Sequence, residues 1–426
     1  MEIIKKPCLD NLIPDANIRI PAYGWSPEGR NANNTNKDNI IIIILESFSS
    51  EYLGTGNSYK GYTPFLDSLA QEGIFFKNNF ANGRTSMQAI PSILAGIPAL
   101  MDEPLITSIY QANEIYGLGT ILKQYGYQTS FFHGGINGTM GFDMFSKISG
   151  MDDYYGMNEY PESENDYDGN WGISDEPFLQ FFAKKLSQYD QPFFSAIFTL
   201  SSHQPYTIPE KYEGKFPKGE LPIHESIGYT DHALKKFFET AKTKAWYNNT
   251  LFIITADHTQ KSSEKVYQNI VGQYRVPLIL FHPENKLPTP KQSFIPTNRI
   301  RYTNKWQVGQ VMAEMGRITQ HADIMPGILD YLGFKTDKVA WFGNSFFNEN
   351  CKGYAINYSA ETYRLIHKDY YIELTTNGDS RLLHFGVGTA MESPDIKKKA
   401  LQKELKAYIQ YFNNGLVENS LYRFTP

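Results

Sequence analysis

The segment NIIIIILES, residues 39–47, decides the fold of this chain. Its six consecutive apolar residues, Ile40–Leu45, show no polar alternation, so both faces of the segment must be covered by protein. The run is too short to cross a membrane and predicts a central strand of a parallel sheet. The first polar residue after it is Glu46. Ligands of open α/β sheets collect beyond the carboxyl ends of the strands, so Glu46 is well placed to bind one.

Composition narrows the class of protein. The 426 residues allow one large α/β domain with an appendage, and the net charge of −5 without any basic block excludes nucleic acid as a partner. Cys8 and Cys351 belong to no CxxC or zinc-type cluster. No run of about eighteen apolar residues occurs, so we expect the chain as given to be soluble.

Residues 1–38 are rich in Asn, Pro and Lys and are expected to form a surface arm. We also expect the chain to be the soluble part of a longer, membrane-anchored protein.

Strand and helix patterns alternate after residue 47, which predicts a mostly parallel, doubly wound sheet flanked by helices. Beyond Gly343, short β-like runs and a final helix predict a small antiparallel sheet. We therefore expect a catalytic α/β domain at 39–345 and a C-terminal β subdomain with a closing helix at 346–426. The expected strands are 74–80, 128–132, 193–200, 250–255, 276–281, 354–358, 362–367, 370–374 and 381–385, and the expected helices are 64–73, 117–125, 178–186, 225–242, 323–332 and 396–412, with one more starting at Thr85.

The acidic, aromatic segment 151–171 is too long for a simple connection. It is expected to be a loop, either the rim or lid of a site or solvated surface.

Polar residues follow several of the expected strands, and parallel strands bring their carboxyl ends to one edge. The carboxylates Glu46 and Asp257 and the imidazole of His258 make a mixed oxygen and nitrogen set that suits a divalent cation. Thr85, at a helix N-terminus, adds a hydroxyl that a metal would activate as a nucleophile. His133 and His203 also lie at strand ends. His321 is expected to begin a helix rather than to bind metal.

The order of these motifs resembles the sulfatase and alkaline-phosphatase-like superfamily, and within it the lipoteichoic acid synthase and phosphoglycerol transferase branch. The resemblance covers residues 39–333. The motifs are IIIIILES (40–47), TPFL (63–66), GRTS (83–86), PSILAG (91–96), TLSSHQPY (199–206), ADH (256–258) and VPL (276–278).

The resemblance implies roles for individual residues. It places the metal ligands at Glu46, Asp257 and His258 and the threonine nucleophile, itself a metal ligand, at Thr85. His203 matches a residue that contacts the phosphate or protonates a leaving group, and His133 matches a histidine near the headgroup pocket. Arg84, next to the nucleophile, is expected to neutralise a phosphate oxygen.

The chain departs from the family pattern at several positions. Lipoteichoic acid synthases carry Trp and Arg where this chain has Met140 and Phe142, so the headgroup pocket is expected to differ. Thr259 follows Asp257 and His258 where a glycine is usual. Residues 85–89 read TSMQA and lack the C/S-x-P-x-R motif of true sulfatases, so sulfate ester hydrolysis by that route is not expected.

The resemblance implies a metal-dependent phosphotransferase that works outside the cytoplasm. It would move a glycerol-phosphate-like group from a phospholipid headgroup to an alcohol or glycan acceptor at a membrane surface, through a phospho-threonine intermediate. One divalent ion is implied, with Mn²⁺ preferred over Mg²⁺ or Zn²⁺. The alternatives are a phosphodiesterase or sulfatase-like hydrolase, and a catalytically silent binding module; the oligomeric state is left open.

Overall fold

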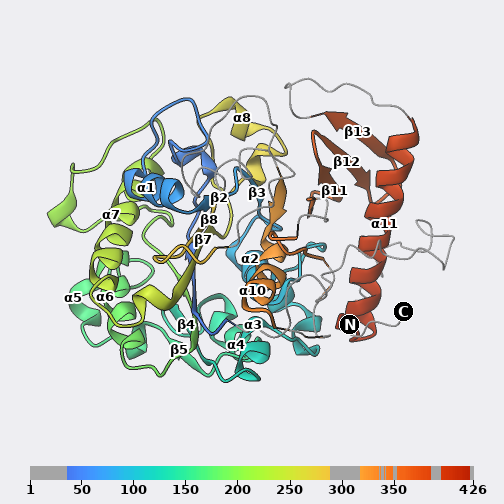
Figure 1. Ribbon diagram of the computed structural model, residues 1–426. Coiled ribbons are helices and arrows are strands. Elements are labelled where there is room, and N and C mark those ends of the chain that lie inside the picture. The colour runs from blue at the N-terminus through green and yellow to red at the C-terminus, as the bar shows by residue number, and fades with distance from the viewer. Residues whose placement is uncertain are drawn as a thin grey trace, which may run out of the picture.

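The computed structural model describes residues 36–287, 317–334, 336, 340, 342–348, 353–384 and 395–422. Its centre is a seven-stranded sheet with the order β2-β8-β7-β1-β6-β4-β5 (Figure 1). The predicted mostly parallel sheet is confirmed, with β8 as the one strand that runs against its neighbours on both sides. The strands are β1 (Asn39–Leu45), β2 (Ile74–Phe75), β4 (Gln128–His133), β5 (Asp153–Tyr155), β6 (Phe193–Phe198), β7 (Thr250–Ala256) and β8 (Leu278–Phe281).

Strand β1 lies in the middle of this sheet, as its all-apolar sequence predicts. All six residues from Ile40 to Leu45 are fully buried. Alternate side chains point to opposite faces: Ile40, Ile42 and Ile44 join one hydrophobic cluster, and Ile41, Ile43 and Leu45 join another. Each face of the sheet therefore has its own core.

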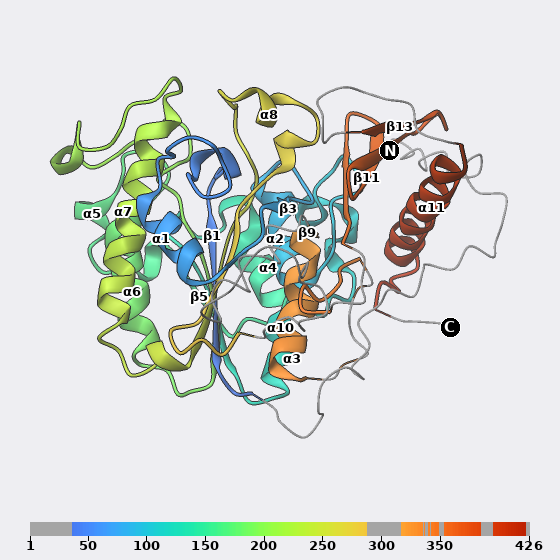
Figure 2. The ribbon, with the colours of Figure 1, turned by 45° about the horizontal axis from the view of Figure 1, so that its top comes forward.

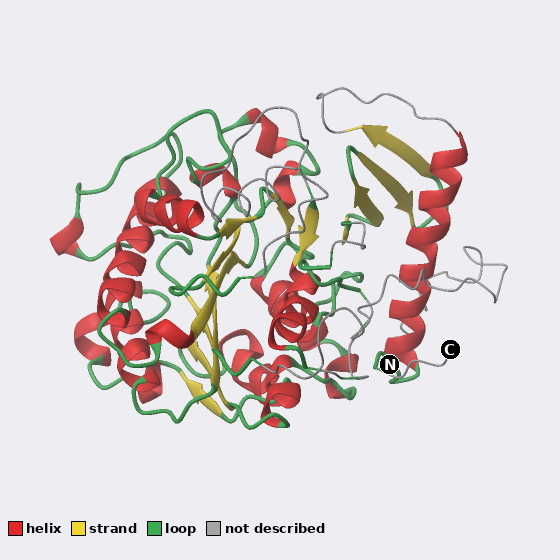
Figure 3. Ribbon diagram, in the orientation of Figure 1, coloured by secondary structure: helices red, strands yellow, loops and turns green. Residues whose placement is uncertain are grey.

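Helices cover both faces of the sheet (Figures 1 and 3). On one side lie α1 (Pro64–Glu72), α6 (Asp175–Leu186) and α7 (Ile223–Ala241), which supply apolar side chains to the cluster of Ile41 and Ile43. On the other side lie the helices whose apolar residues share the cluster of Ile40 and Ile42. These are α2 (Ser86–Ala95), α3 (Leu118–Lys123), α4 (Phe142–Ile148) and α10 (Ile324–Leu332).

The predicted C-terminal antiparallel sheet is also confirmed. Its four strands pair in chain order, and the long helix α11 (Asp395–Val417) packs against them, on the far side of α2 and α10 from the central sheet (Figure 2). Buried residues of this sheet and of α11 belong to the same hydrophobic cluster as Ile40. The domain boundary near residue 345 stays a prediction. The strands are β10 (Ala355–Ser359), β11 (Thr362–His367), β12 (Tyr370–Thr375) and β13 (Ser380–His384).

Two local predictions were wrong. The single strand expected over residues 74–80 is two strands in different sheets: β2 pairs with β8, whereas β3 (Asn78–Phe80) pairs with β9 (Ile318–Gln320). The segment 151–171 is not all loop, because β5 extends the central sheet by pairing with Ser130–Phe132, and a short helix, α5 (Ser163–Asp166), follows. Long-range pairing decides both cases, and local sequence does not carry it.

Some expectations fall outside the described residues. These include the surface arm up to residue 35 and both cysteines. Among the helices that are described, none combines the length and the apolar character that a membrane span requires.

The central position of β1 makes a prediction for stability. Replacing Ile43 by alanine removes fully buried methyl groups, so the free energy of unfolding should fall by about 2–5 kcal/mol. Ile109→Ala is the matched control, because the Ile109 side chain is 65% exposed and its loss should change stability by less than about 0.5 kcal/mol. Urea unfolding followed by circular dichroism measures both. Equal losses in the two variants would contradict the central placement of β1.

Candidate metal centre

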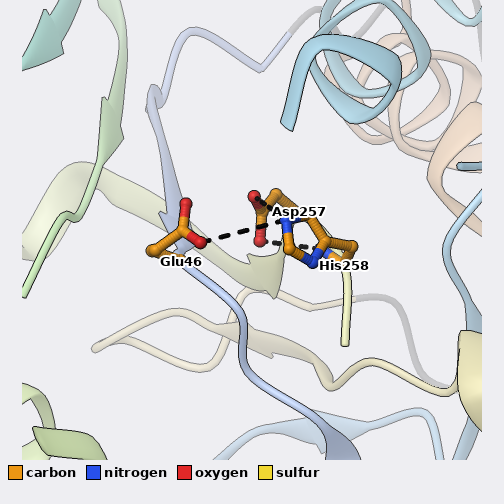
Figure 4. Close-up of side chains that lie close together, drawn as sticks. All are labelled: Glu46, Asp257 and His258. Atoms are coloured by element: carbon orange, nitrogen blue, oxygen red, sulfur yellow. Dashed lines mark hydrogen bonds and ion pairs between the residues drawn. The ribbon is translucent and has the colours of Figure 1, made fainter. Parts of the chain in front are cut away.

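Parallel pairing of β1 and β7 creates the site. Leu45 lies opposite Ala256 in the register, so the next residues, Glu46 and Asp257, leave the sheet side by side. Ligand atoms of Glu46, Asp257 and His258 all lie within 4.8 Å of one another, and all three residues are buried. Figure 4 shows the three side chains pointing toward one another. The predicted ligand set therefore does come together in space.

Hydrogen bonds hold the two β7-end residues in position. The backbone N–H groups of Ser47 and His258 donate to Asp257 Oδ1 over 2.8 and 2.7 Å. Asp257 Oδ2 is buried, has no hydrogen-bond partner among the described residues, and lies 3.2 Å from His258 Nε2. His258 Nδ1 lies 3.0 Å from the Thr259 carbonyl oxygen, which requires a proton on Nδ1 and leaves Nε2 on the side of the carboxylates. That Nε2 is 3.9 Å from Glu46 Oε1.

The two buried carboxylates of the site repel each other, and a bound cation would reduce this repulsion. Burial, and next the negative charge of Asp257, raise the pKa of the Glu46 carboxyl well above its ordinary value. Hydroxyl groups offset this in part: Ser47 Oγ donates to Glu46 Oε1 over 2.5 Å and Ser86 Oγ to Oε2 over 3.4 Å. The two buried carboxylates, of which Asp257 has one oxygen without a hydrogen-bond partner among the described residues, and the imidazole of His258 fit a divalent metal ion. Such an ion would remove the repulsion between the carboxylates.

Thr85 lies at the N-cap of α2, as predicted, and its side chain makes no capping hydrogen bond to the helix. The residue is exposed, and the next residue, Ser86, contacts Glu46. The structure thus places the start of α2 beside the carboxylate cluster. Its free N–H groups favour an anion there.

The guanidinium of Arg84 contacts Gln273 and Tyr274. Its guanidinium donates to Gln273 Oε1 over 2.6 Å and lies over the ring of Tyr274, 5.4 Å from the ring centre. Arg84 is not among the residues that line the pocket beside Glu46. Its expected role at the phosphate stays a prediction.

A pocket opens beside Glu46 and contains both of the other predicted histidines. Its empty volume, counted together with open solvent at its mouth, is about 260 Å³. His133 is buried, its ring is stacked on Phe198, and burial lowers its pKa to about 4, so its imidazole is neutral at physiological pH. His203 packs against Trp171 with 4.1 Å between ring centres. The lining residues are Glu46, Ser86, His133, Thr139, Met140, Phe142, Trp171, Phe198, Thr199, Leu200 and His203.

Comparison with known proteins agrees with this geometry. The family model described as Sulfatase matches residues 38–334, well over half of the chain. The chain belongs to the sulfatase family. The matched part contains β1, the start of α2 and the Asp257–His258 pair, so every residue of the candidate metal centre lies within it.

Individual relatives of this sulfatase-family chain include lipoteichoic acid synthases. It is 26% identical to the lipoteichoic acid synthase of Staphylococcus aureus over 411 residues, which are 91% of this chain and 58% of that protein. The solved lipoteichoic acid synthase LtaP from Listeria monocytogenes has the same fold, with a TM-score of 0.70, 19% identity and coverage of 95% of this chain and 97% of that one. A protein in the alkaline phosphatase superfamily from Vibrio parahaemolyticus superposes with a TM-score of 0.76 at 22% identity, covering 92% of this chain and 90% of that one.

Sequence reasoning missed several residues of the site. Ser47 follows Glu46 at the end of β1, and Ser86 follows Thr85 at the start of α2, so their positions next to predicted site residues could have included them. Asp175 has no such signal: its carboxylate accepts hydrogen bonds from the backbone N–H groups of Leu200 and Ser201 and from the Thr230 hydroxyl, and so anchors the loop that carries His203. Trp171 ends the acidic segment 151–171, and only the fold brings it to the pocket.

His321 begins a helical segment, as expected, and its Nε2 donates to the Ala256 carbonyl oxygen over 2.8 Å.

The carboxylate cluster predicts how stability depends on metal and pH. We expect an ion at about 100 times its Kd to add about 2.7 kcal/mol to the free energy of unfolding. In the metal-free protein, the raised pKa of Glu46 means that its contribution to stability is present at low pH and is lost as pH rises through the folded-state pKa. Metal-free Glu46→Gln should therefore be more stable than the metal-free parent at pH 8, and the difference should shrink toward pH 5.

Differential scanning calorimetry with and without Mn²⁺ measures these effects. Glu46→Gln should lose most of the metal-induced rise in Tm. Glu239→Gln is the control, because the Glu239 side chain is 49% exposed on α7 and pairs only with Lys236 in the described structure. A parent whose Tm is unaffected by both metal and chelator would contradict a metal site here.

Proposed function

We propose that this chain is a metal-dependent phosphotransferase of the phosphoglycerol transferase or lipoteichoic acid synthase type. It moves a glycerol-phosphate-like group from a phospholipid headgroup to an alcohol or glycan acceptor. The observation that carries the proposal is the buried cluster of Glu46, Asp257 and His258 beside the N-terminus of α2. There the hydroxyl of Thr85 makes no capping hydrogen bond to the helix. The match to lipoteichoic acid synthases supports it, although the chain spans only 58% of the length of the Staphylococcus aureus protein.

Glu46, Asp257 and His258 would hold the metal ion, with Thr85 as the ligand that reacts. Bound there, a divalent ion supplies positive charge that favours the deprotonated hydroxyl and offsets the negative charge of a phosphodiester. The donor set of two carboxylates, an imidazole and a hydroxyl favours Mn²⁺, with Mg²⁺ and Zn²⁺ as the other candidates.

Thr85 begins the reaction. Its Oγ1 forms a bond to phosphorus while the bond between phosphorus and the oxygen of the departing alcohol breaks, which leaves a phospho-threonine intermediate. The proton lost by the Thr85 hydroxyl balances the proton gained by the departing alcohol. We expect His203, which lines the same pocket as Glu46 and Ser86, to deliver this proton. The N–H groups at the start of α2 stabilise the negative oxygens of the phosphoryl group.

The second step reverses the first with a new alcohol. The acceptor hydroxyl loses its proton to His203, its oxygen bonds to phosphorus, and the bond from phosphorus to Thr85 Oγ1 breaks. Thr85 Oγ1 then regains the proton that it lost in the first step, which restores the hydroxyl. Neutral His133 binds the headgroup as a hydrogen-bonding group rather than as a cation. For Arg84 to neutralise a phosphate oxygen, its guanidinium must leave Gln273.

The proposal includes a location. A donor that is a membrane phospholipid requires the catalytic domain to work at a membrane surface. We propose that this surface lies outside the cytoplasm, in the periplasm or on the outer face of the cytoplasmic membrane.

Thr85→Ala tests the nucleophile. The variant should fold normally, because Thr85 is exposed and makes no capping hydrogen bond, and should lose at least about a thousandfold in kcat on a chromogenic phosphodiester. Thr85→Ser, which keeps a hydroxyl, should retain measurable activity. Thr243→Ala, at an exposed threonine just beyond the end of α7, should match the parent. Full activity in Thr85→Ala would refute the proposed mechanism.

Product analysis separates transfer from hydrolysis. With a fluorescent phosphatidylglycerol donor and a glycolipid acceptor, a transferase yields diacylglycerol and a phosphoglycerol-extended acceptor in equal amounts. Release of free glycerol phosphate without an extended acceptor would instead show a phosphodiesterase that uses the same threonine.

A further inference from the structure

Ser47, the residue after Glu46, contacts both carboxylates of the candidate metal centre. Its backbone N–H donates to Asp257 Oδ1 over 2.8 Å, and its hydroxyl donates to Glu46 Oε1 over 2.5 Å. Ser47 is fully buried. One residue therefore ties together two carboxylates that follow different strands, β1 and β7, and that repel each other when no cation is bound.

These two hydrogen bonds decide which oxygens are left for a metal ion. Asp257 Oδ1 also accepts the backbone N–H of His258, so Oδ2 is the oxygen without a partner among the described residues, and it lies 3.2 Å from His258 Nε2. Glu46 Oε1, which the Ser47 hydroxyl holds, lies 3.9 Å from the same nitrogen (Figure 4). The contacts of Ser47 thus keep one oxygen of each carboxylate beside the imidazole.

A neighbouring side chain sets the direction of the Ser47 hydroxyl. Gln260 Nε2 donates to Ser47 Oγ over 3.2 Å. A serine hydroxyl has only one hydrogen to donate, and an ionised carboxylate can only accept. The Ser47 hydrogen is therefore directed to Glu46, while Gln260 occupies the accepting side of the hydroxyl.

The backbone of Glu46 is fixed by other hydroxyl groups. Its N–H donates to Thr199 Oγ1 over 2.9 Å, and its carbonyl oxygen accepts from Ser202 Oγ over 2.5 Å. The direction of the Glu46 carboxylate is a separate matter. Its other side-chain contact of this kind, from Ser86 Oγ, is longer at 3.4 Å, so Ser47 provides the shorter of the two bonds that orient the carboxylate.

The backbone conformation of Ser47 is unusual. Its φ is 59°, in the left-handed region that residues with a side chain rarely adopt. Glycine adopts this conformation without a steric penalty, so the turn at the end of β1 does not by itself require a serine. Strained backbone of this kind persists only where the surrounding structure enforces it, and it concentrates at functional sites.

We propose that Ser47 is a positioning residue of the metal centre. It holds the carboxylates of Glu46 and Asp257 together before a divalent ion binds, so that binding requires no rearrangement of these two ligands. The inference rests on the proposed function through its metal ion alone, because Ser47 acts through the metal ligands and not on the phosphodiester.

Calorimetric titration of the metal-free protein with MnCl₂ tests the proposal. Ser47→Ala removes the hydroxyl and should raise the Kd for Mn²⁺ at least about tenfold, as the loss of a group that orients a metal ligand usually does. Ser345→Ala is the matched control, because Ser345 is also fully buried and its hydroxyl donates over 2.5 Å to Asp330 Oδ2, on α10. Its Kd should match that of the parent. An unchanged Kd in Ser47→Ala, or an equal rise in both variants, would overturn the proposal.

Ser47→Gly separates the hydroxyl from the backbone. Glycine keeps the N–H that Asp257 accepts and adopts a φ of 59° without strain, so this variant should fold even if Ser47→Ala does not. We expect the same rise in the Kd for Mn²⁺ as in Ser47→Ala. Thermal unfolding in the presence of EDTA checks that each variant folds. A Kd equal to that of the parent would overturn the role of the hydroxyl, because the backbone alone would then suffice.

Turnover of a chromogenic phosphodiester, measured beside the titration, separates this inference from the proposed function. If Ser47→Ala loses Mn²⁺ affinity but Thr85→Ala is as active as the parent, the proposed function fails and the positioning role stands. If turnover depends on Thr85 but Ser47→Ala binds Mn²⁺ as the parent does, the positioning role fails and the proposed function stands. A parent that binds no Mn²⁺ would overturn the positioning role whatever the turnover assay shows.

Discussion

The repulsion between two buried carboxylates is the constraint around which this structure is organised. Glu46 and Asp257 leave the sheet together because β1 and β7 are parallel neighbours, and the register that pairs Leu45 with Ala256 fixes their spacing. Without a cation, burial and the charge of Asp257 push the pKa of Glu46 upward. The fold therefore holds two carboxylates together at a cost in free energy that a bound metal ion would offset, which is typical of a functional site rather than of a core.

The surrounding elements hold this pair in place. Backbone N–H groups of Ser47 and His258 fix one oxygen of Asp257, and the Thr259 carbonyl sets the tautomer of His258. His321 supports the end of β7 through the Ala256 carbonyl oxygen. Partners of this kind orient metal ligands and tune them, so the precision of the centre depends on residues outside the ligand set.

The same sheet edge also joins the metal centre to the pocket. β4 ends in His133, and the loop after β6 carries His203, whose position depends on the buried Asp175 at the start of α6. The carboxylate cluster and residues of the pocket thus lie at the ends of neighbouring parallel strands. Family membership agrees with the shared centre, whereas Met140 and Phe142 give the pocket of this chain its own character.

The sequence by itself determined the central strand, the mostly parallel sheet and the cluster of Glu46, Asp257 and His258, because an all-apolar run followed by a carboxylate is compatible with few structures. Glu46, Asp257 and His258 could be predicted since strand ends in a parallel sheet converge whatever the loops do. Only the tertiary structure showed that β8 is antiparallel to its neighbours and that residues 74–80 are divided between two sheets. It also showed that Trp171 lines the pocket and that Arg84 donates to Gln273. Each of these depends on contacts between residues far apart in the chain. Local patterns record the periodicity of a segment and not its distant partners, so these features could be found only in the folded molecule.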